Sequence, residues 1–479
     1  MRKYTQNIIH ILIILSGVYF FIFHNASKLI LQIWDESLYA VNAAEMWLNK
    51  EFFKYYFMLE PTTYNVKPPL VIWFQLLSIN FFGINEFSIR LPSLLAGLII
   101  CFAIFYFIKK HFNTIAAFSV LIFLLSTYGF NRPHVIRTGD LDGVLLLFTS
   151  CYTLVWLQML LNKNIKSIWL FALLVFLACI SKSVAGLIPL TGIVFATLGT
   201  GNFWIFKSIK LYIYALIVLM LYIIYYLIAE FYNPGTINLV YESEILRLTK
   251  DIMTWHHQPW HYYFSNLFYN NLGYYTYLLF ILPVSLFFTN KTQQKIILFC
   301  IIYSLSILLF ISIPPTKIAS YDASVYPFLV ICIGCCIFIL IQTLTKKIKQ
   351  DFVRKFLFLI TIIIITYPAL VNTLKLNNFF LPKDEFEKTG YAMKQLSVVY
   401  PEIKQYYVYM PTKYKEHKAQ AWFYMLMFND RGYNIQFSDS IHQNNINYML
   451  VSNTYKDSIL FEHKLIAEIE ENRLIKLND

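Results

Sequence analysis

Long apolar stretches, separated by short polar segments, make up most of the first 373 residues. Stretches of near-spanning length lie at 7–24, 91–108, 114–129, 141–161, 166–181, 184–200, 207–229, 269–289, 295–313, 322–343 and 355–373. A membrane-spanning helix needs about 20 predominantly apolar residues, so each stretch is expected to cross a bilayer, although some are short. The pattern predicts a mainly α, polytopic transmembrane helical bundle of about 11–13 spans.

Basic residues mark every second connection between these stretches. If Met1 lies in the cytoplasm, the inside connections carry Lys109-Lys110, Lys163 with Lys166, Lys207 with Lys210, Lys291 with Lys295, and Lys346-Lys347 through Lys355. This is the positive-inside pattern, and it favours an odd number of spans with the chain's end outside. The first stretch lacks an Ala-x-Ala cleavage pattern before Trp34, so we expect an uncleaved span rather than a signal peptide.

Three longer segments then face outward: 25–90, 230–268 and 374–479. The first contains a short apolar stretch, 69–83, which we expect to form an interfacial or re-entrant helix. In the tail, 406–410, 433–437 and 447–451 read as strands, 418–428 as a helix, and 465–469 with 473–477 as a closing hairpin. We therefore predict a transmembrane domain over 1–373, with outer loops 25–90 and 230–268, and a small α/β soluble domain over 374–479 on the outer face.

Composition supports a membrane protein and excludes other classes. Hydrophobic residues make up 58% of the chain and charged residues 14%, with a formal net charge of +12. The tail from 375 onward holds 13 basic and 13 acidic residues, so the excess lies in the apolar part. That excess suits anionic lipid head groups better than nucleic acid. The cysteines all fall in apolar runs, so we expect neither disulfides nor a cysteine metal site.

Carboxylates stand at two outer ends of spans. Asp35 and Glu36 open a segment in which Asp35 and Tyr39 share one helical face. Asp35 reads either as the N-cap of an interfacial helix or as a general base at the membrane surface. Asp140 and Asp142 open the stretch 141–161, and one of them is expected to cap that helix.

Basic residues on the outer side break the positive-inside pattern. They are Lys67, Arg132, Arg137, Lys182 and Lys317. A cation near hydrocarbon needs an anion, and the simplest one is a lipid phosphate. Tyr321, which follows Lys317 by four residues, can donate a hydrogen bond to the same group. The alternative for Lys67 is a lysine that reaches from the membrane to the interface.

Histidines gather in the second outer loop, at His256, His257 and His261. They fit a metal site or acid–base chemistry. The aromatic residues among them fit an interfacial belt instead.

Several of these motifs, in this order, resemble the membrane glycosyltransferases of the C superfamily. The branch concerned holds the lipid A aminoarabinose transferases and the bacterial relatives of protein O-mannosyltransferases. The residues that carry the resemblance span about 30–330 and are Asp35-Glu36-x-x-Tyr39-Ala40, Lys67-Pro68-Pro69-Leu70, Phe82-Gly83-x-x-Glu86-Phe87-x-x-Arg90-Leu91-Pro92-Ser93, Arg137-Thr138 with Asp142, Ser181-Lys182, His257 with Pro259 and Tyr262-Tyr263, and Lys317-x-x-x-Tyr321.

The resemblance implies an inverting transfer of a sugar from a polyprenyl-phosphate carrier to a lipid, glycan or protein acceptor, at the periplasmic face of a bacterial inner membrane. Its implied catalytic residues are Asp35, Asp142 and Asp140. The donor phosphate is assigned to Lys67, Arg137, Lys182, Lys317, Tyr321 and Tyr39. The acceptor, or support of its site, is assigned to Glu36, Tyr64 and His257.

Two positions depart from the family pattern. Leu38 stands where members often have arginine, which removes one phosphate contact. Val66 stands where several lipid A transferases have a glutamate that, with a loop histidine, can hold zinc. No cofactor is therefore assigned, and a divalent metal at His256 and His257 stays an alternative. The aminoarabinose reaction is disfavoured for the same reason.

Two rival functions use the same outer cations. A glycan ligase would take a longer lipid-linked glycan. A transporter or flippase would bind the carrier without chemistry, but it leaves the paired carboxylates unexplained, and the internal repeats typical of transporters are not visible.

Overall fold

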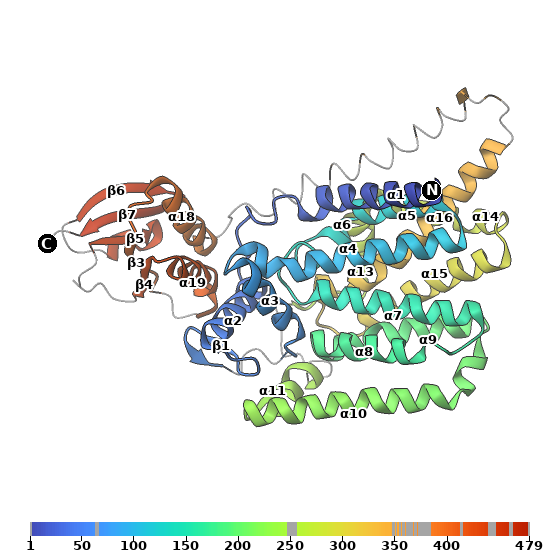
Figure 1. Cartoon of the computed structure of the whole chain (residues 1–479), viewed down its shortest axis with the longest axis horizontal. Helices are drawn as coiled ribbons and strands as arrows, with labels where there is room; N and C mark the ends of the chain where they lie inside the picture. The colour runs from blue at the N-terminus through green and yellow to red at the C-terminus, as the bar shows by residue number, and fades with distance from the viewer. Residues whose placement is uncertain are drawn as a thin grey trace.

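The computed structural model describes residues 2–62, 67–246, 256–346, 385–411, 415–438, 447–458 and 463–477, with scattered positions between 350 and 371. A large helical bundle forms one part of the molecule and a smaller sheet-containing domain the other (Figure 1). Segment 25–90, the first outer segment of the predicted topology, contains α2 (Asp35–Asn49) and α3 (Leu70–Phe82), which lie between them.

The bundle is built from long apolar helices, as the sequence pattern predicts. Those long and apolar enough to span a membrane are α4 (Glu86–His111), α7 (Asp142–Asn162), α8 (Ile168–Lys182) continued by η2 (Ser183–Gly186), α10 (Ile209–Tyr232), α15 (Lys291–Ser312), and η8 (Ala319–Val325) continued by α16 (Tyr326–Lys346). Shorter apolar helices are α1 (Arg2–Val18) with η1 (Tyr19–Phe23), α3, α5 (Thr114–Ser126), α9 (Ile188–Gly199), and η7 (Gly273–Ile281) with α14 (Leu282–Leu286). The multi-pass prediction is confirmed, and most of the predicted stretch 355–373 lies outside the described residues.

Short elements connect these helices. They are β1 (Tyr56–Phe57), β2 (Glu60–Pro61), α6 (Tyr128–Asn131), η3 (Phe203–Lys207), α11 (Thr236–Val240), η4 (Tyr241–Leu246), α13 (Tyr262–Asn266) and η6 (Leu267–Asn271). Asparagines mark where several spans begin. Asn85, Asn113 and Asn290 cap α4, α5 and α15 by accepting hydrogen bonds from backbone amides of the first turn. Such caps satisfy donors that lipid cannot satisfy.

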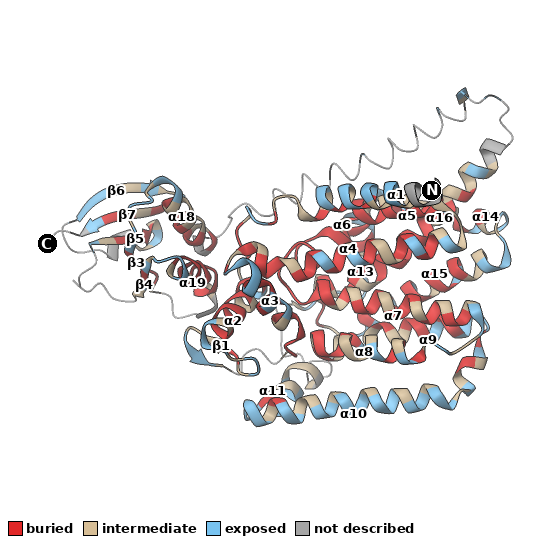
Figure 2. Cartoon of the chain, viewed as in Figure 1, coloured by how far each residue is buried: buried red, intermediate tan, exposed pale blue. Residues whose placement is uncertain are grey.

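Burial differs sharply among the spans, because some face protein and others face lipid. The most apolar 18-residue window of 319–343 is 83% buried, whereas that of α10 is 0% buried. Figure 2 shows α10 exposed along its length at one edge of the bundle. The exposed apolar side chains of α10 are of the kind that pack against lipid in a membrane protein.

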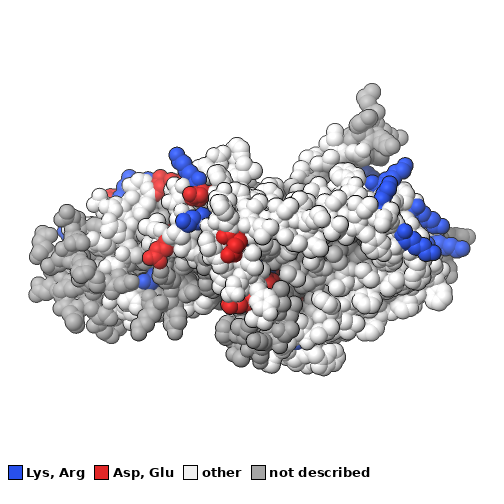
Figure 3. Space-filling view, turned by 90° about the horizontal axis from the view of Figure 1, so that it is seen from below, with Lys and Arg blue, Asp and Glu red and all other residues white. Residues whose placement is uncertain are grey.

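Basic side chains gather at the end of the bundle far from the sheet domain (Figure 3). Lys109 and Lys110 end α4, while Lys163 follows α7 and Lys291 begins α15. Helix α2, whose first residue is Asp35, lies at the opposite end, next to the sheet domain (Figure 1). The two ends of the bundle thus differ in charge in the way that the connection pattern predicts.

The C-terminal domain carries a five-stranded sheet in the order β4-β3-β5-β7-β6. Its strands are β3 (Gln405–Tyr409), β4 (Asn434–Ser438), β5 (Tyr448–Ser452), β6 (His463–Ile469) and β7 (Asn472–Leu477). β3 pairs in parallel with β4 and β5, and β6 and β7 form the expected hairpin. The predicted strands and helix α19 (Lys415–Asp430) are confirmed, whereas α18 (Glu385–Val399) was not anticipated.

The C-terminal domain and the first outer segment share one hydrophobic core. Ala43 and Met46 of α2 and Ile79 of α3 belong to the same buried cluster as Phe423 and Leu426 of α19. Polar contacts lie beside this core. The Tyr424 hydroxyl accepts a hydrogen bond from the Leu31 amide (3.1 Å) and contacts Glu86 (3.2 Å), while the Trp422 indole donates to Glu45 (2.8 Å). Helix α2 is therefore fixed from the side of the C-terminal domain.

A buried ion pair between Glu36 and Arg90 holds the other side of α2. The Arg90 Nε and Glu36 Oε1 atoms are 2.6 Å apart, and both side chains are fully buried. The guanidinium also donates to the carbonyls of Ala26 (2.9 Å), Leu29 (2.8 Å) and Ile30 (2.7 Å). Glu36 accepts further bonds from the amides of Gln32 (2.7 Å) and Gly139 (2.8 Å). Because the polar atoms on both sides have partners, the pair can be tolerated at full burial.

Replacing Arg90 should destabilise the protein strongly. Arg90→Met leaves Glu36 buried without its cation, and removing one partner of a buried pair typically costs about 3–5 kcal/mol. The measurement is the free energy of unfolding of the purified protein in detergent. The matched control is Arg473→Met, which removes a half-buried arginine near the exposed Glu468, where a loss of about 1 kcal/mol is expected. A similar small loss for Arg90→Met would contradict this account.

Removing the Tyr424 hydroxyl should weaken the attachment of the C-terminal domain. Tyr424→Phe leaves the buried Leu31 amide without its acceptor, which costs about 1–3 kcal/mol. Thermal unfolding in detergent, beside the sheet variant Tyr448→Phe as control, measures the difference. Equal midpoints for the two variants would show that the shared apolar core alone holds the domain.

Candidate active site

Asp35 is the first residue of α2, at the end of the bundle next to the C-terminal domain. The preceding residue, Trp34, has a φ of 69° and occupies the N-cap position without a side-chain cap. The N-cap interpretation of Asp35 is therefore wrong. Its side chain is exposed, whereas that of the next residue, Glu36, is buried. Glu36 was expected to contact the acceptor or to support the site. Its carboxylate is buried in an ion pair with Arg90, away from solvent.

The loop before α7 brings a histidine and a second carboxylate to Asp35. His134 adopts a φ of 62°, and its amide donates to the Thr138 hydroxyl (2.8 Å). The His134 Nδ1 and Asp140 Oδ1 atoms are 3.2 Å apart. Potential metal-ligand atoms of Asp35, His134 and Asp140 all lie within 4.8 Å of one another. Sequence reasoning missed His134, although it stands in the same polar run as Arg137 and Asp140.

Mutual charge changes the pKa values of these groups. The Asp140 carboxylate raises the pKa of His134 to about 9, and this effect outweighs burial, which lowers the pKa of the imidazole. Burial pushes the pKa of Asp140 upward, but His134, the Thr138 hydroxyl and the charge of Lys182 together outweigh burial and lower this pKa. The Asp35 side chain reaches solvent, but the protein packed around its carboxylate raises its pKa by burial. The negative charge of Asp140 raises the pKa of Asp35 further. A carboxylate with a raised pKa is a better proton acceptor than an ordinary one.

Asp142 and Lys182 meet on the other side of this group. The Lys182 Nζ and Asp142 Oδ2 atoms are 2.5 Å apart. The Lys182 ammonium also lies 5.6 Å from the centre of the Tyr321 ring. Asp142 begins α7 as its first helical residue, since Leu141 is the N-cap, so capping by an aspartate side chain is not observed there. The charges of Lys182 and Asp142 both act on Asp35, so these residues form one electrostatic unit.

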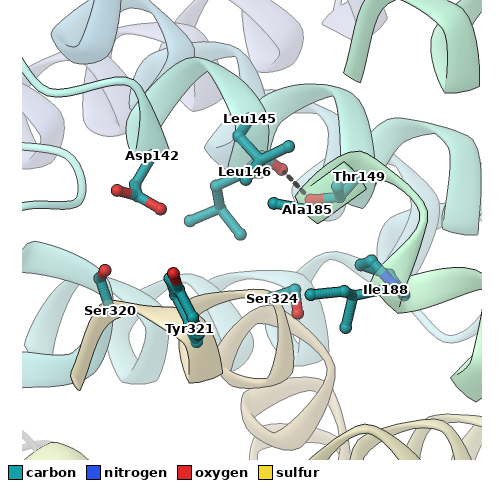
Figure 4. Close-up of a pocket in the computed structure, with 11 residues that line it drawn as sticks. Asp142, Leu145, Leu146, Thr149, Ala185, Ile188, Ser320, Tyr321 and Ser324 are labelled. Atoms are coloured by element: carbon teal, nitrogen blue, oxygen red, sulfur yellow. Dashed lines mark hydrogen bonds between the residues drawn. The ribbon is translucent and has the colours of Figure 1, made fainter. Parts of the chain in front are cut away.

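A small cleft opens beside this unit. Asp142 of α7 and Tyr321 of η8 lie on opposite walls (Figure 4). Ser320 and Ser324 add hydroxyls on the η8 side, and Leu145 and Ile188 are among the apolar lining residues. Tyr39 lies near Asp35 and Tyr321, and burial and these neighbours raise its pKa far above the ordinary value. Tyr39 is thus a neutral hydrogen-bonding group in this site.

The remaining expected phosphate ligands have other partners in the structure. Lys67 forms an ion pair with Glu244 of η4. Lys317 is buried and donates to the carbonyls of Gln258 (3.0 Å) and Pro314 (2.7 Å). Arg137 is buried and donates to the carbonyls of Phe21 (3.2 Å) and His24 (2.9 Å), at the end of the first span.

These placements revise the expected phosphate site. Arg137 binds the carboxyl-terminal end of the first span, where helix carbonyls lack intrahelical partners. These contacts occupy part of its guanidinium, and its assignment to the donor phosphate stays a prediction. Lys67 and Lys182 hold carboxylates, which are the protein groups most like a phosphate oxygen in charge. Tyr64 lies outside the described residues.

The histidines of the second outer loop do not join the acidic group. His257 forms an isolated antiparallel bridge with Thr316. Among the described residues, the group of three or more side chains that could hold a metal is Asp35, His134 and Asp140, and neither His256 nor His257 is part of it. In the part of the chain that the structure describes, no group of three or more potential ligands therefore includes His256 or His257, where a metal was the alternative.

Comparison with known proteins places this site in context. Residues 66–226 match the family model described as dolichyl-phosphate-mannose-protein mannosyltransferase. An uncharacterised protein of Aquifex aeolicus is 25% identical over 424 residues, which cover 83% of this chain and 80% of that protein.

Two crystal structures share the fold over nearly the whole chain. ArnT from Cupriavidus metallidurans bound to undecaprenyl phosphate matches with a TM-score of 0.67 and 16% identity, over 98% of both chains. Its apo state matches with a TM-score of 0.69 and 16% identity, over 99% of this chain and 98% of that one. The matched family segment and the shared fold confirm that this multi-pass membrane protein resembles the membrane glycosyltransferases of the C superfamily.

Proposed function

We propose that this protein is an inverting glycosyltransferase that moves a sugar from a polyprenyl-phosphate carrier to a lipid, glycan or protein acceptor. One observation carries the proposal. Asp35, Asp140 and Asp142 meet the cation of Lys182 at one end of an apolar bundle, although these residues come from three separate segments of the chain.

The comparisons support the same donor class. The matched segment, 66–226, contains Lys67, Asp142 and Lys182, and its family is named for a lipid-phosphate-linked mannose donor. The solved structure of ArnT with undecaprenyl phosphate shows that this fold can bind a polyprenyl phosphate.

The proposed reaction requires a proton acceptor for the attacking group and a cation for the leaving phosphate. An acceptor hydroxyl or amine attacks the anomeric carbon, the bond from that carbon to the phosphate oxygen breaks, and the phosphate leaves with the electron pair. The acceptor's proton passes to the Asp35 carboxylate. Phosphate is a good leaving group, so cationic stabilisation by Lys67 and Lys182 replaces a strong general acid. Direct attack opposite the leaving group inverts the anomeric carbon.

Binding of the donor phosphate requires an exchange of partners. Lys67 is paired with Glu244, and Lys182 with Asp142. A phosphate that approaches either ammonium displaces a carboxylate. When Lys182 is engaged in this way, Asp142 becomes free to orient the acceptor beside Asp35. Tyr321 lies on the same cleft and supplies a further donor.

We further propose that the site faces the periplasm of a bacterial inner membrane. The basic end of the bundle, with Lys109 and Lys110, is opposite the end with Asp35. Basic connections favour the cytoplasm. The C-terminal domain then lies on the outer face with the site, where its contacts with α2 allow it to influence the acceptor.

Asp35→Asn should abolish sugar transfer while the protein stays folded in the membrane. The amide keeps the shape of the side chain but cannot take the acceptor's proton. The measurement is movement of label from a radiolabelled polyprenyl-phosphate sugar to a new acceptor in a membrane extract. Asp430→Asn, on the exposed end of α19, is the matched control. Full activity of Asp35→Asn would remove Asp35 from catalysis, and label that the wild-type protein only retains would indicate a carrier.

Lys67→Met should raise the KM for the donor by roughly tenfold or more, because one charge-assisted contact to the phosphate is lost. Lys54→Met, in the same outer segment, is the matched control. Steady-state kinetics with the labelled donor give KM and kcat separately. An unchanged KM would place Lys67 outside the donor site and leave its pair with Glu244 as a structural contact.

A further inference from the structure

The group formed by Asp35, His134 and Asp140 has the composition of a metal-binding site. One imidazole nitrogen and two carboxylate oxygens lie within 4.8 Å of one another. Two of these residues come from the loop before α7 and the third from the start of α2. The three ligands are thus held on different segments, and the Glu36–Gly139 hydrogen bond (2.8 Å) fixes those segments to each other.

A second observation points to a ligand. Asp140 is only 1% exposed, and its Oδ2 atom is buried without a hydrogen-bond partner in the described structure. Buried carboxylate oxygens are normally satisfied, and one that is not needs an explanation such as an ion. The Oδ1 atom of the same carboxylate already contacts His134. The unsatisfied oxygen therefore belongs to the potential ligand group itself.

We propose that Asp35, His134 and Asp140 bind a divalent transition-metal ion such as Mn²⁺ or Zn²⁺. The donor set decides the class of ion. Ca²⁺ and Mg²⁺ prefer all-oxygen coordination, whereas imidazole suits Zn²⁺ and related metals and carboxylates suit Mn²⁺. Asp35 is exposed, so solvent reaches the site and coordination positions stay available for an exogenous ligand.

The site deepens the proposed function, and its role in catalysis rests on that function. A metal-bound hydroxyl loses its proton more readily, because the cation stabilises the oxyanion. An acceptor hydroxyl held there would be activated beside Asp35. If Asp35 binds the ion through one oxygen, the other stays available for the proton. Metal binding itself is a property of the protein alone and can be measured without sugar transfer.

The contrasting explanation is that His134 and Asp140 form only an ion pair. That pair would account for their 3.2 Å contact without any metal. It would not account for the unsatisfied Oδ2 of Asp140 or for the third ligand, Asp35. The two explanations differ in what a titration with metal shows.

The experiment is a titration of the chelator-treated full-length protein in detergent with Mn²⁺, followed by electron paramagnetic resonance, and with Zn²⁺, followed by calorimetry. We expect one site per chain. His134→Ala should weaken binding by about tenfold or more, since even loss of a group that only supports a ligand costs about 10–100-fold. His261→Ala, in the second outer loop, is the matched control and should bind like the wild-type protein.

Several results would overturn the proposal. Absence of saturable binding of both ions to the wild-type protein would leave His134 and Asp140 as an ion pair only. Binding that survives His134→Ala but is lost in His261→Ala would place the metal in the second outer loop. Asp140→Asn, checked for folding by its thermal unfolding, provides an independent variant if His134→Ala is unstable. A protein that binds Mn²⁺ at this site but transfers no sugar would refute the proposed function and leave the metal site intact.

Discussion

The buried ion pair of Glu36 and Arg90 is the constraint on which the candidate site depends. Asp35 precedes Glu36 in the chain, and Asp140 follows Gly139, whose amide Glu36 binds. One carboxylate thus fixes two neighbouring segments that each carry a reactive aspartate. Arg90 extends the same network to the carbonyls of 26–30. An uncompensated charge at this depth is strongly unfavourable, so the network permits little variation in where Asp35 lies.

Charge at this end of the bundle is mostly paired within the protein. Lys182 meets Asp142, Lys67 meets Glu244, and His134 meets Asp140. Near a low-dielectric membrane such pairing keeps ionised groups at tolerable energy. The same pairing keeps reactive groups in defined positions before a substrate arrives. Pre-positioned charges of this kind are the main means by which enzymes stabilise developing charge.

The sequence predicted the features that depend on local pattern. The apolar stretches and the strands of the C-terminal domain are each determined by neighbouring residues, and the observed helices and strands confirm them. It also singled out Asp35, Asp142 and Lys182, which the structure brings together. It could not tell which of the adjacent residues Asp35 and Glu36 turns inward, because the rotation of α2 is set by packing against Arg90 and α19.

Contacts between segments far apart in the chain could not be predicted from the sequence either. His134 has no motif of its own, and its importance comes from a left-handed backbone and the nearby Asp140. The carbonyl partners of Arg137 and Lys317 belong to segments that no spacing rule connects to them. Helix α18 was missed because many of its residues are polar, and its short buried side, formed by Ala392, Met393 and Leu396, packs against residues of distant segments.

Helix α10 connects the exposed apolar edge of the bundle, through α11 and η4, to the partner of Lys67, a proposed donor ligand. Its 24 residues extend about 36 Å at 1.5 Å per residue, which exceeds the roughly 30 Å of hydrocarbon in a typical membrane. A span longer than the hydrocarbon is accommodated by tilting, by kinking or by local thickening of the bilayer. The segment that follows α10 leads through α11 to η4 and Glu244, the partner of Lys67. Through this chain connection, we expect a change in the tilt of α10 to move Glu244 relative to Lys67.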